Sequence, residues 1–396
     1  MNSKPARRAR RVTLATRIWE PEPAAAAFRL RSLAGQMRHL GARVQVHTST
    51  PPPKLVDEAK RADQKANFKV RRHRVLRGAD GYLRGYFQYL SFDVPLFFHL
   101  LLEKSPDIYV CEPPPTTGII TRIVSTLKRR PYVYYAADIW SDASESANVP
   151  GFVVSALRFV EGLVLKGAAL VIAVNDEVAS RAKNLGARNV ETVRNGVDTT
   201  IFRPDGPGSP LRGERYFVYA GTMSEWQGSE VFLDAFVKIH REFPDAKLVF
   251  VGQGNAVDEL RQTIDEHGMD KAVTILQPVS PEEAAAYQRD AVAALVSIKP
   301  GIGYDMAFPT KTMAAWGCGT PVIYSGVGPA RELLQENNLG WAVDYEANQV
   351  ANAMRLALEV LQDSVQISEW AKDEVSLQSS SERAAQAIFR CADVRN

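Results

Sequence analysis

Short runs of β-branched and aromatic residues, unbroken by polar alternation, recur along the whole chain and alternate with longer segments of helical periodicity. Such runs suit parallel strands that are covered by helices on both faces. Because βαβ connections are right-handed, a series of this kind winds into a doubly wound sheet. The first series predicts strands at residues 11–18, 44–48, 107–111, 132–136, 170–174 and 190–193, and a helix at residues 24–40 that ends at Gly41.

A second series begins after residues 202–215, a segment rich in proline, glycine and charge that indicates an exposed connection between compact units. It predicts strands at residues 216–221, 247–252, 273–276, 291–297 and 321–326. The expected fold class is therefore α/β, with two doubly wound, Rossmann-like domains at residues 1–201 and 216–378. Ligands of such sheets bind at the carboxyl ends of the strands, and two facing domains would enclose a cleft.

The composition favours a globular protein of a reducing compartment. A chain of 396 residues that is 45% hydrophobic can bury a large core. Cys111, Cys318 and Cys391 are odd in number and have no CxxC spacing, which argues against a disulfide framework and against a zinc site. No apolar run approaches ~18 residues, and the basic start precedes a segment too short for a signal peptide. We therefore expect a cytoplasmic protein that does not cross a membrane.

The net charge of +3 conceals an asymmetry along the chain. Residues 1–90 carry 20 Lys and Arg against 6 Asp and Glu, a balance of +14. Part of this excess is concentrated at Lys69, Arg71, Arg72, Arg74, Arg77 and Arg84, just before the apolar run VPLFFHLLL at residues 94–102. One interpretation is a surface for anionic lipid at the inner face of the cell membrane, or for a phosphorylated substrate; the other is a solvated basic face beside an ordinary core helix. Nucleic acid is not an expected partner, because no recognised binding motif accompanies the charge.

Residues 309–326, PTKTMAAWGCGTPVIYSG, contain a single charged side chain, that of Lys311. Pro309 and Thr310 favour the start of a helix, where free backbone N–H groups and the helix dipole attract an anion. Lys311 adds a full positive charge at the same place, so a nucleotide diphosphate fits the predicted site. The alternative is a first-turn lysine that only faces solvent.

Four motifs, in register along the chain, resemble the retaining glycosyltransferases of family 4, which have the GT-B fold. They are VRNGVDTTIFRP, YAGTMSEWQG, VFVGQGNAVDEL and FPTKTMAAWGCGTPVIYSG, at residues 193–204, 219–228, 249–260 and 308–326. In the first half, WEPEPAAAAFR, CEPPPTTG and ADIWSDA are similar to a branch that acts in bacterial cell-envelope polysaccharide and natural-product glycosylation.

The resemblance implies an activity and separate roles for the two domains. The activity is transfer of a sugar from a nucleotide-diphosphate sugar, with UDP as the first expectation, to an acceptor hydroxyl with retention of the anomeric configuration. The acceptor would be a glycan, a lipid-linked sugar or a small natural product bound by the N-terminal domain, and a helix at residues 379–396 would return toward that domain. The chain has no Asp-x-Asp metal-binding triplet, so Lys311 and backbone dipoles would stabilise the leaving group and no metal cofactor is expected.

The resemblance also assigns residues to the two substrates. The donor side would contain Lys311, Thr310, Gly221, Thr222, Gln227, Gly252, Gly254, Ala314, Gly326 and Gly328, and the acceptor side Arg29, Glu22, Pro114 and Thr116. Asp138 and Asp305 are the catalytic candidates, although Asp138 could instead cap a helix and Asp305 could instead form a turn. Gly252 and Gly254 follow a strand like a dinucleotide fingerprint, but Val257 replaces the third glycine, which favours a tight strand-to-helix turn.

Two departures from the family pattern bear on activity. Most members carry two glutamates around this lysine, the second of which binds the ribose hydroxyls, and Met306 and Ala314 occupy those positions here. Thr222 and Gln227 stand where many members have Arg and Lys. Two alternatives therefore remain open. One is a catalytically silent nucleotide-sugar-binding homologue or partner subunit, and the other is a nucleotide-sugar epimerase of the same architecture, which would need further acid and base side chains.

Overall fold

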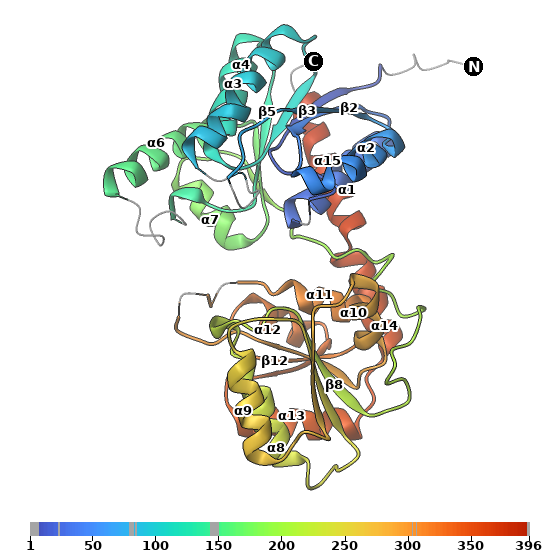
Figure 1. Cartoon of the computed structure of the whole chain (residues 1–396). Helices are drawn as coiled ribbons and strands as arrows, with labels where there is room; N and C mark the ends of the chain where they lie inside the picture. The colour runs from blue at the N-terminus through green and yellow to red at the C-terminus, as the bar shows by residue number, and fades with distance from the viewer. Residues whose placement is uncertain are drawn as a thin grey trace, which may run out of the picture. The chain divides into compact units, whose positions relative to one another are not determined.

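The computed structural model describes residues 8–22, 24–78, 83, 85–142, 150–302, 304–305 and 307–393, so Arg84 and Met306 lie outside the described residues. The chain divides into two compact units (Figure 1). Unit 1 comprises residues 1–195 and 380–396, and unit 2 comprises residues 196–379. Each unit is built on one parallel sheet, which confirms the predicted α/β class with two Rossmann-like domains.

Unit 1 contains a seven-stranded sheet in the order β3-β2-β1-β4-β5-β6-β7. The strands are β1 (Arg11–Ala15), β2 (Arg43–Ser49), β3 (Lys69–His73), β4 (Ile108–Cys111), β5 (Tyr132–Ala136), β6 (Leu170–Ala173) and β7 (Val190–Thr192). The helices are α1 (Ala25–His39), α2 (Val56–Lys65), α3 (Tyr86–Leu102), α4 (Pro115–Leu127), α6 (Gly151–Gly167), α7 (Asp176–Asn184) and α15 (Leu377–Asp393). Every residue of β4, β5 and β6 is buried, as expected for central strands covered on both faces.

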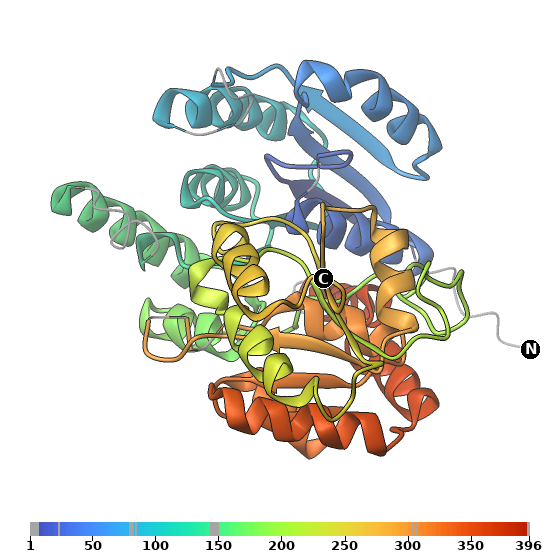
Figure 2. The ribbon, with the colours of Figure 1, turned by 60° about the horizontal axis from the view of Figure 1, so that its bottom comes forward.

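Unit 2 contains a six-stranded sheet in the order β10-β9-β8-β11-β12-β13. The strands are β8 (Tyr216–Ala220), β9 (Lys247–Val251), β10 (Val273–Leu276), β11 (Ala293–Ser297), β12 (Val322–Ser325) and β13 (Gly340–Val343). Helices α8 (Glu230–Ile239), α9 (Val257–His267) and α13 (Ala347–Glu359) share one apolar core with the sheet, while α11 (Thr310–Gly317), α12 (Pro329–Glu336) and α14 (Ser364–Glu374) share the other (Figures 1 and 2). Helix α10 (Pro281–Arg289) packs beside α11.

Two edge strands were not predicted from the sequence. β3 has the sequence KVRRH and was interpreted only as part of a basic cluster, and β13 has the short, half-buried sequence GWAV. An edge strand has one neighbour instead of two and tolerates charged side chains. It therefore does not need the unbroken apolar run by which the central strands were recognised.

Residues 202–215 are grouped with unit 2; many of their side chains are exposed, and a few contacts anchor the segment to that unit. The Ser209 backbone N–H donates to Asp290 at 2.5 Å, and its hydroxyl lies 3.0 Å from the Tyr216 hydroxyl. The Arg289 guanidinium donates to the carbonyl of Arg203 at 2.7 Å. These contacts move the division between the units to Asn195, before the proline-rich segment instead of within it.

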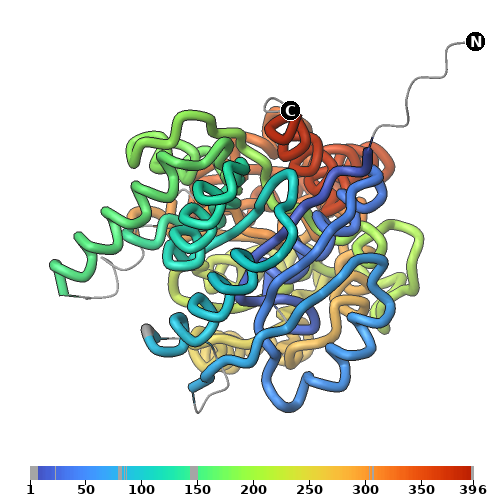
Figure 3. The backbone as a smooth tube through the Cα atoms, turned by 90° about the horizontal axis from the view of Figure 1, so that it is seen from above, coloured from blue at the N-terminus to red at the C-terminus, as the bar shows by residue number. Residues whose placement is uncertain are grey.

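The C-terminal helix α15 belongs to unit 1 from Ser380 onward. Its Ile388 and Phe389 side chains are buried in the core of that unit. Arg10 pairs with Asp393 at 2.5 Å and lies over the Phe389 ring, which fixes the helix beside the first strand (Figure 3). Among the helices of the described ranges, none has the length and hydropathy needed to span a bilayer.

Candidate functional site

A pocket of about 500 Å³ opens in unit 2 where β8 and β9 end and α11 begins. β8 pairs with β9 on one side and with β11 on the other, and this switch point is where doubly wound sheets bind ligands. Seven predicted donor-side residues line the pocket: Gly221, Thr222, Gln227, Gly252, Thr310, Lys311 and Ala314. The opposite wall comes from residues 196–202, the loop after β10 and helix α10.

Lys311 reaches from the first turn of α11 toward the end of β8. Its Nζ donates to the Tyr219 hydroxyl at 2.6 Å, lies 3.8 Å from the centroid of the Tyr219 ring, and is 3.4 Å from the Thr222 carbonyl oxygen. Burial lowers the pKa of Lys311 to about 7, and no carboxylate of the described residues counteracts this. The ammonium group therefore lacks the negative partner that a bound diphosphate would supply.

The start of α11 adds backbone donors to the same place. Pro309 precedes the helix in an extended conformation and provides no side-chain cap. Because the first N–H groups of a helix have no acceptor within it, those of Thr310 and Lys311 can bind an anion with the help of the helix dipole.

Gln227 also lines this part of the pocket and contacts Lys311. When its amide nitrogen donates to the Thr222 carbonyl and the Ser224 hydroxyl, its oxygen accepts from Lys311 Nζ at 3.3 Å. The groups that accept hydrogen bonds from the lysine are thus neutral oxygens of side chains and of the backbone. A bound diphosphate would replace them as the acceptor.

Glycines bring the loops after β8 and β9 together. Gly221 has φ 138°, and a Cβ atom there would stand 3.3 Å from Lys311 Cε. A Cβ atom at Gly252 would lie 2.0 Å from the Gly221 carbonyl oxygen, and one at Gly254 would lie 2.0 Å from that of Met223. Gly252 and Gly254 are therefore required for close packing of the two loops, in agreement with the tight-turn interpretation.

The other residues predicted on the donor side do not all line the pocket with polar groups. Ala314 is 8% exposed and presents only a methyl group to the pocket, while Gly254, Gly326 and Gly328 are not among the residues that line it. Asp305 accepts a hydrogen bond from the Gly301 backbone N–H at 2.8 Å, which supports its turn-forming interpretation over a catalytic one.

Arg29, which is predicted to contact the acceptor, is buried in unit 1. Its guanidinium pairs with Glu112 at 2.9 Å and donates to the Asn195 side chain at 3.1 Å. Glu112 also accepts from the Thr16 hydroxyl at 2.6 Å. With Arg29 only 5% exposed, this network holds the carboxyl end of the first sheet together.

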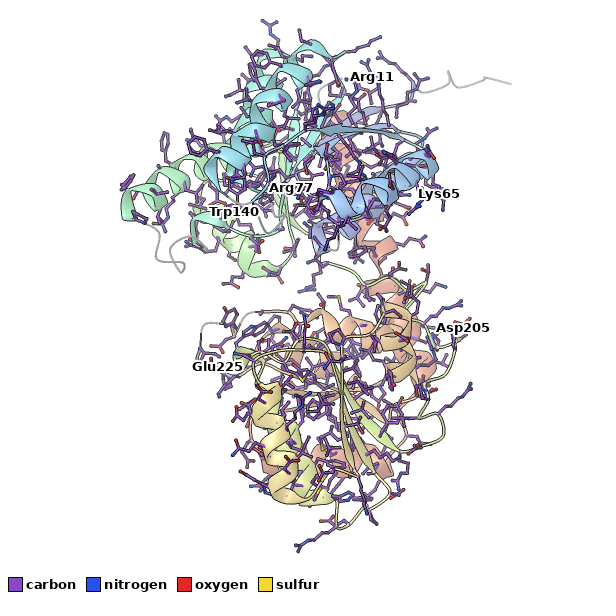
Figure 4. The ribbon with its side chains drawn as sticks, viewed as in Figure 1. Arg11, Lys65, Arg77, Trp140, Asp205 and Glu225 are labelled. Atoms are coloured by element: carbon purple, nitrogen blue, oxygen red, sulfur yellow. The ribbon has the colours of Figure 1, made fainter. Side chains whose placement is uncertain are left out.

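The other acceptor-side predictions also lie at this end of the sheet. Glu22 is held by both terminal nitrogens of Arg77 at 3.1 Å, and Figure 4 shows Arg77 and Trp140 lower in unit 1 than Arg11. Thr116 accepts from Arg17 at 2.5 Å in the first turn of α4, which Pro114 precedes. Arg17 is itself paired with the buried Asp93 at 2.5 Å.

Asp138 follows β5 at the same end of the sheet and has an exposed side chain. The protein around its carboxylate removes part of the water shell and raises its pKa, and the charge of Arg29 opposes this rise. A raised pKa suits a group that accepts a proton from an acceptor hydroxyl. In the described ranges, no three His, Cys, Asp or Glu side chains gather closely enough to hold a metal ion.

Several residues of these clusters were missed in the sequence. Glu112 lies within the CEPPPTTG motif and could have been found there as the carboxylate nearest the proline turn. Arg17, Asp93 and Gln288 carry no local signal, because they join these clusters only through contacts between distant segments. Tyr219 begins the YAGTMSEWQG motif but was not singled out.

Comparison with known proteins agrees with this architecture. Residues 25–196 match the model of the glycosyl transferase 4-like domain, and residues 208–374 match that of the glycosyl transferases group 1. The chain therefore belongs to the family-4 type of GT-B glycosyltransferases.

Curated relatives and solved structures give more distant likenesses. The chain is 29% identical over 197 residues to a D-inositol 3-phosphate glycosyltransferase of Pseudarthrobacter chlorophenolicus, and this match covers 46% of each protein. It is 30% identical over 178 residues to a GDP-mannose-dependent alpha-(1-6)-phosphatidylinositol monomannoside mannosyltransferase of Mycobacterium tuberculosis, covering 42% of this chain and 46% of the relative. These matches span about half the length of the relatives. The structure of HepE from Anabaena in complex with UDP and glucose shares the fold, with a TM-score of 0.67, 18% identity, and coverage of 96% of this chain and 100% of the other.

Proposed function

We propose that the protein transfers a sugar from a nucleotide-diphosphate sugar to an acceptor hydroxyl. The observation that carries this proposal is Lys311, a cation without an ion-pair partner in the described residues, placed at a helix start in the switch-point pocket. Lys311 and the first N–H groups of α11 would hold the diphosphate and stabilise the charge that develops on it as it leaves. Retention of the anomeric configuration is proposed from family membership.

We favour UDP as the nucleotide. A fold neighbour was solved with UDP, whereas one sequence relative is named as GDP-mannose-dependent, so both nucleotides belong in the test. The decisive experiment is a thermal-shift screen of nucleotide sugars, followed by mass spectrometry of products formed with phosphorylated polyols, lipid-linked sugars and small natural products as acceptors.

The proposal includes sugar transfer that does not depend on a metal ion. Since the diphosphate charge is met by Lys311 and backbone N–H groups, transfer is expected to persist in EDTA. A strict requirement for added Mg²⁺ or Mn²⁺ would contradict this assignment.

The two alternatives lead to different outcomes. Ala314 keeps the silent homologue open, and nucleotide binding without hydrolysis or transfer would favour it. An epimerase needs acid and base groups near the sugar, but no histidine of the described residues lines the pocket. His47, His73 and His99 instead cluster around β2, β3 and α3 of unit 1, where burial lowers the pKa of His73 to about 4.

We also propose that unit 1 binds an anionic membrane surface on the cytoplasmic side. A pocket of about 720 Å³ at the amino ends of β1, β2 and β3 is lined by Arg11, Arg43, Lys69, Arg71 and Lys104. Beside it, α3 exposes Phe87, Leu90, Val94, Phe98 and Leu102, spaced along one face of the helix. Leu100, within the apolar run at residues 94–102, is 1% exposed and belongs to the core, so it is not part of this exposed face.

A further inference from the structure

A second basic pocket lies in unit 1, at the edge of the sheet where β5, β6 and β7 begin. It has a volume of about 470 Å³, and the C-terminal ends of the neighbouring helices α4 and α6 form two of its walls. Five of the side chains that line it are cationic: Arg122, Arg129, Arg130, Lys166 and Arg188. Among the described residues, no Asp or Glu lines this pocket, and none of its five cations forms an ion pair.

The helix ends around the pocket do not account for this much positive charge. Helices α4, α6 and α7 each precede one of the three strands, so their C-terminal ends lie at this edge of the sheet. A helix C-terminus carries about half a negative charge, and three of them amount to about 1.5. The pocket holds five positive charges against these. Most of its charge therefore remains available to an anion from outside.

Arg122 has a fixed position in this pocket. It is half-buried, and its guanidinium donates to the Leu163 carbonyl of α6. Gly167 makes room for it, because a Cβ atom there would lie 2.8 Å from Arg122 Nε and 2.8 Å from the Tyr132 hydroxyl oxygen. A guanidinium has five N–H groups, so the hydrogen bond to Leu163 leaves others for the oxygens of a ligand.

Exposed apolar side chains accompany these cations on α4. Ile123 is 42% exposed and Leu127 is 62% exposed, and the two lie one turn apart on the helix. Each directly follows a residue that lines the pocket, Arg122 or Thr126. Cations beside exposed apolar side chains suit the phosphate of a lipid at a membrane surface, whereas a soluble phosphorylated compound would use the cations alone.

We propose that this pocket binds a phosphate group, carried either by an anionic lipid or by a soluble phosphorylated compound. Arginine suits this ligand because its planar fork can donate two hydrogen bonds to one phosphate. The site is separate from Lys311, which belongs to unit 2, and from Asp138, which follows β5 at the other edge of the sheet. It shares no lining residue with the basic pocket at β1, β2 and β3. The inference thus goes beyond the proposed function and does not depend on it.

The first test measures inorganic pyrophosphate binding by calorimetry at low salt, on the full chain with Lys311→Ala so that the donor pocket does not contribute. Lys166→Gln combined with Arg188→Gln should weaken binding by about tenfold or more, the loss expected for a charge-assisted hydrogen bond. The control is Arg61→Gln with Lys183→Gln, exposed cations of α2 and α7 outside the pocket, which should leave the affinity unchanged. Thermal melting checks that both pairs fold; if the pocket pair does not, the exposed Arg129→Gln takes its place and should also weaken binding.

Phosphatidylglycerol vesicles distinguish the two sources of phosphate. For a lipid phosphate, the pocket pair should reduce cosedimentation at low salt, and pyrophosphate should compete with the vesicles. For a soluble compound, the pocket pair should lower only the pyrophosphate affinity. If the pocket pair changes neither measurement, or the control pair loses as much, the pocket is a solvated basic face and the proposal is wrong. UDP binding by the pocket pair with Lys311 intact should match the wild type, and a wild type that binds no nucleotide contradicts the proposed function alone.

Discussion

The buried cations of unit 1 and the half-buried Lys311 of unit 2 have different kinds of partner. In unit 1, Arg17 and Arg29 are each paired with a buried carboxylate, at 2.5 and 2.9 Å. In unit 2, Lys311 contacts a hydroxyl, an aromatic ring and a carbonyl, and no carboxylate of the described residues pairs with it. The paired cations organise the protein, whereas the cation left without a counter-charge is the one equipped to bind an anionic ligand.

The largest expected effect comes from breaking a paired cation. Arg29→Ala leaves the Glu112 carboxylate buried without its partner, so the free energy of unfolding should fall by about 3–5 kcal/mol. Urea denaturation measures this loss. Arg194→Ala removes an exposed pair with Asp176 and should cost about 0–1 kcal/mol. A comparably small loss for both variants would show that the buried network does not hold the first sheet together.

Replacing Lys311, which has no ion-pair partner among the described residues, should weaken ligand binding and leave stability unchanged. Lys311→Ala is expected to weaken UDP binding by about 1.5–3 kcal/mol, the range for a hydrogen bond to a charged group, without lowering stability. Calorimetry provides the affinity and thermal melting the stability. Lys247→Ala removes an exposed lysine paired with Glu214 and serves as the control. Equal affinities of Lys311→Ala and the wild type would exclude Lys311 from the diphosphate site.

This contrast also explains how far the sequence could be interpreted. The central strand β5 was predicted at its observed bounds, because strands buried on both faces require unbroken apolar runs. Lys311 was identified because it is the only charge in its segment and stands at a helix start. The pairing of Arg29 with Glu112, and the presence of Gln288 and Ala314 in one pocket, depend on separate segments of the chain, for which local patterns contain no signal.

The depressed pKa of Lys311 predicts how donor binding depends on pH. In the free protein its pKa is about 7, and a bound diphosphate favours the charged form and raises it. Binding above pH 7 must then take up a proton, so the affinity for UDP-glucose should fall by up to about tenfold per pH unit, or about 1.4 kcal/mol, between pH 7 and 8.5. Below pH 7 it should level off. Lys311→Arg keeps its charge across this range and should remove the dependence. A wild-type affinity that is constant over these pH values would contradict the role of the lysine's titration.

The smallest effect concerns the cations of unit 1 that no carboxylate neutralises. Arg72 is paired with Asp63 and Arg77 with Glu22, so these arginines contribute little to binding an outside surface. Arg43, Lys69 and Lys104 are exposed, have no ion-pair partner among the described residues and line the basic pocket. Each should contribute about 1 kcal/mol to attraction toward phosphatidylglycerol vesicles at low salt.

Cosedimentation should therefore be strong at low salt and mostly lost at 1 M, where the Debye length is about 3 Å. Changing these three residues to Ser should weaken it, whereas the same change at Arg241, Lys271 and Lys372, exposed in unit 2, should not. Equal weakening by both triple variants would mean that net charge alone draws the protein to the bilayer. No cosedimentation of the wild type would leave the basic pocket to a phosphorylated soluble substrate or to solvent.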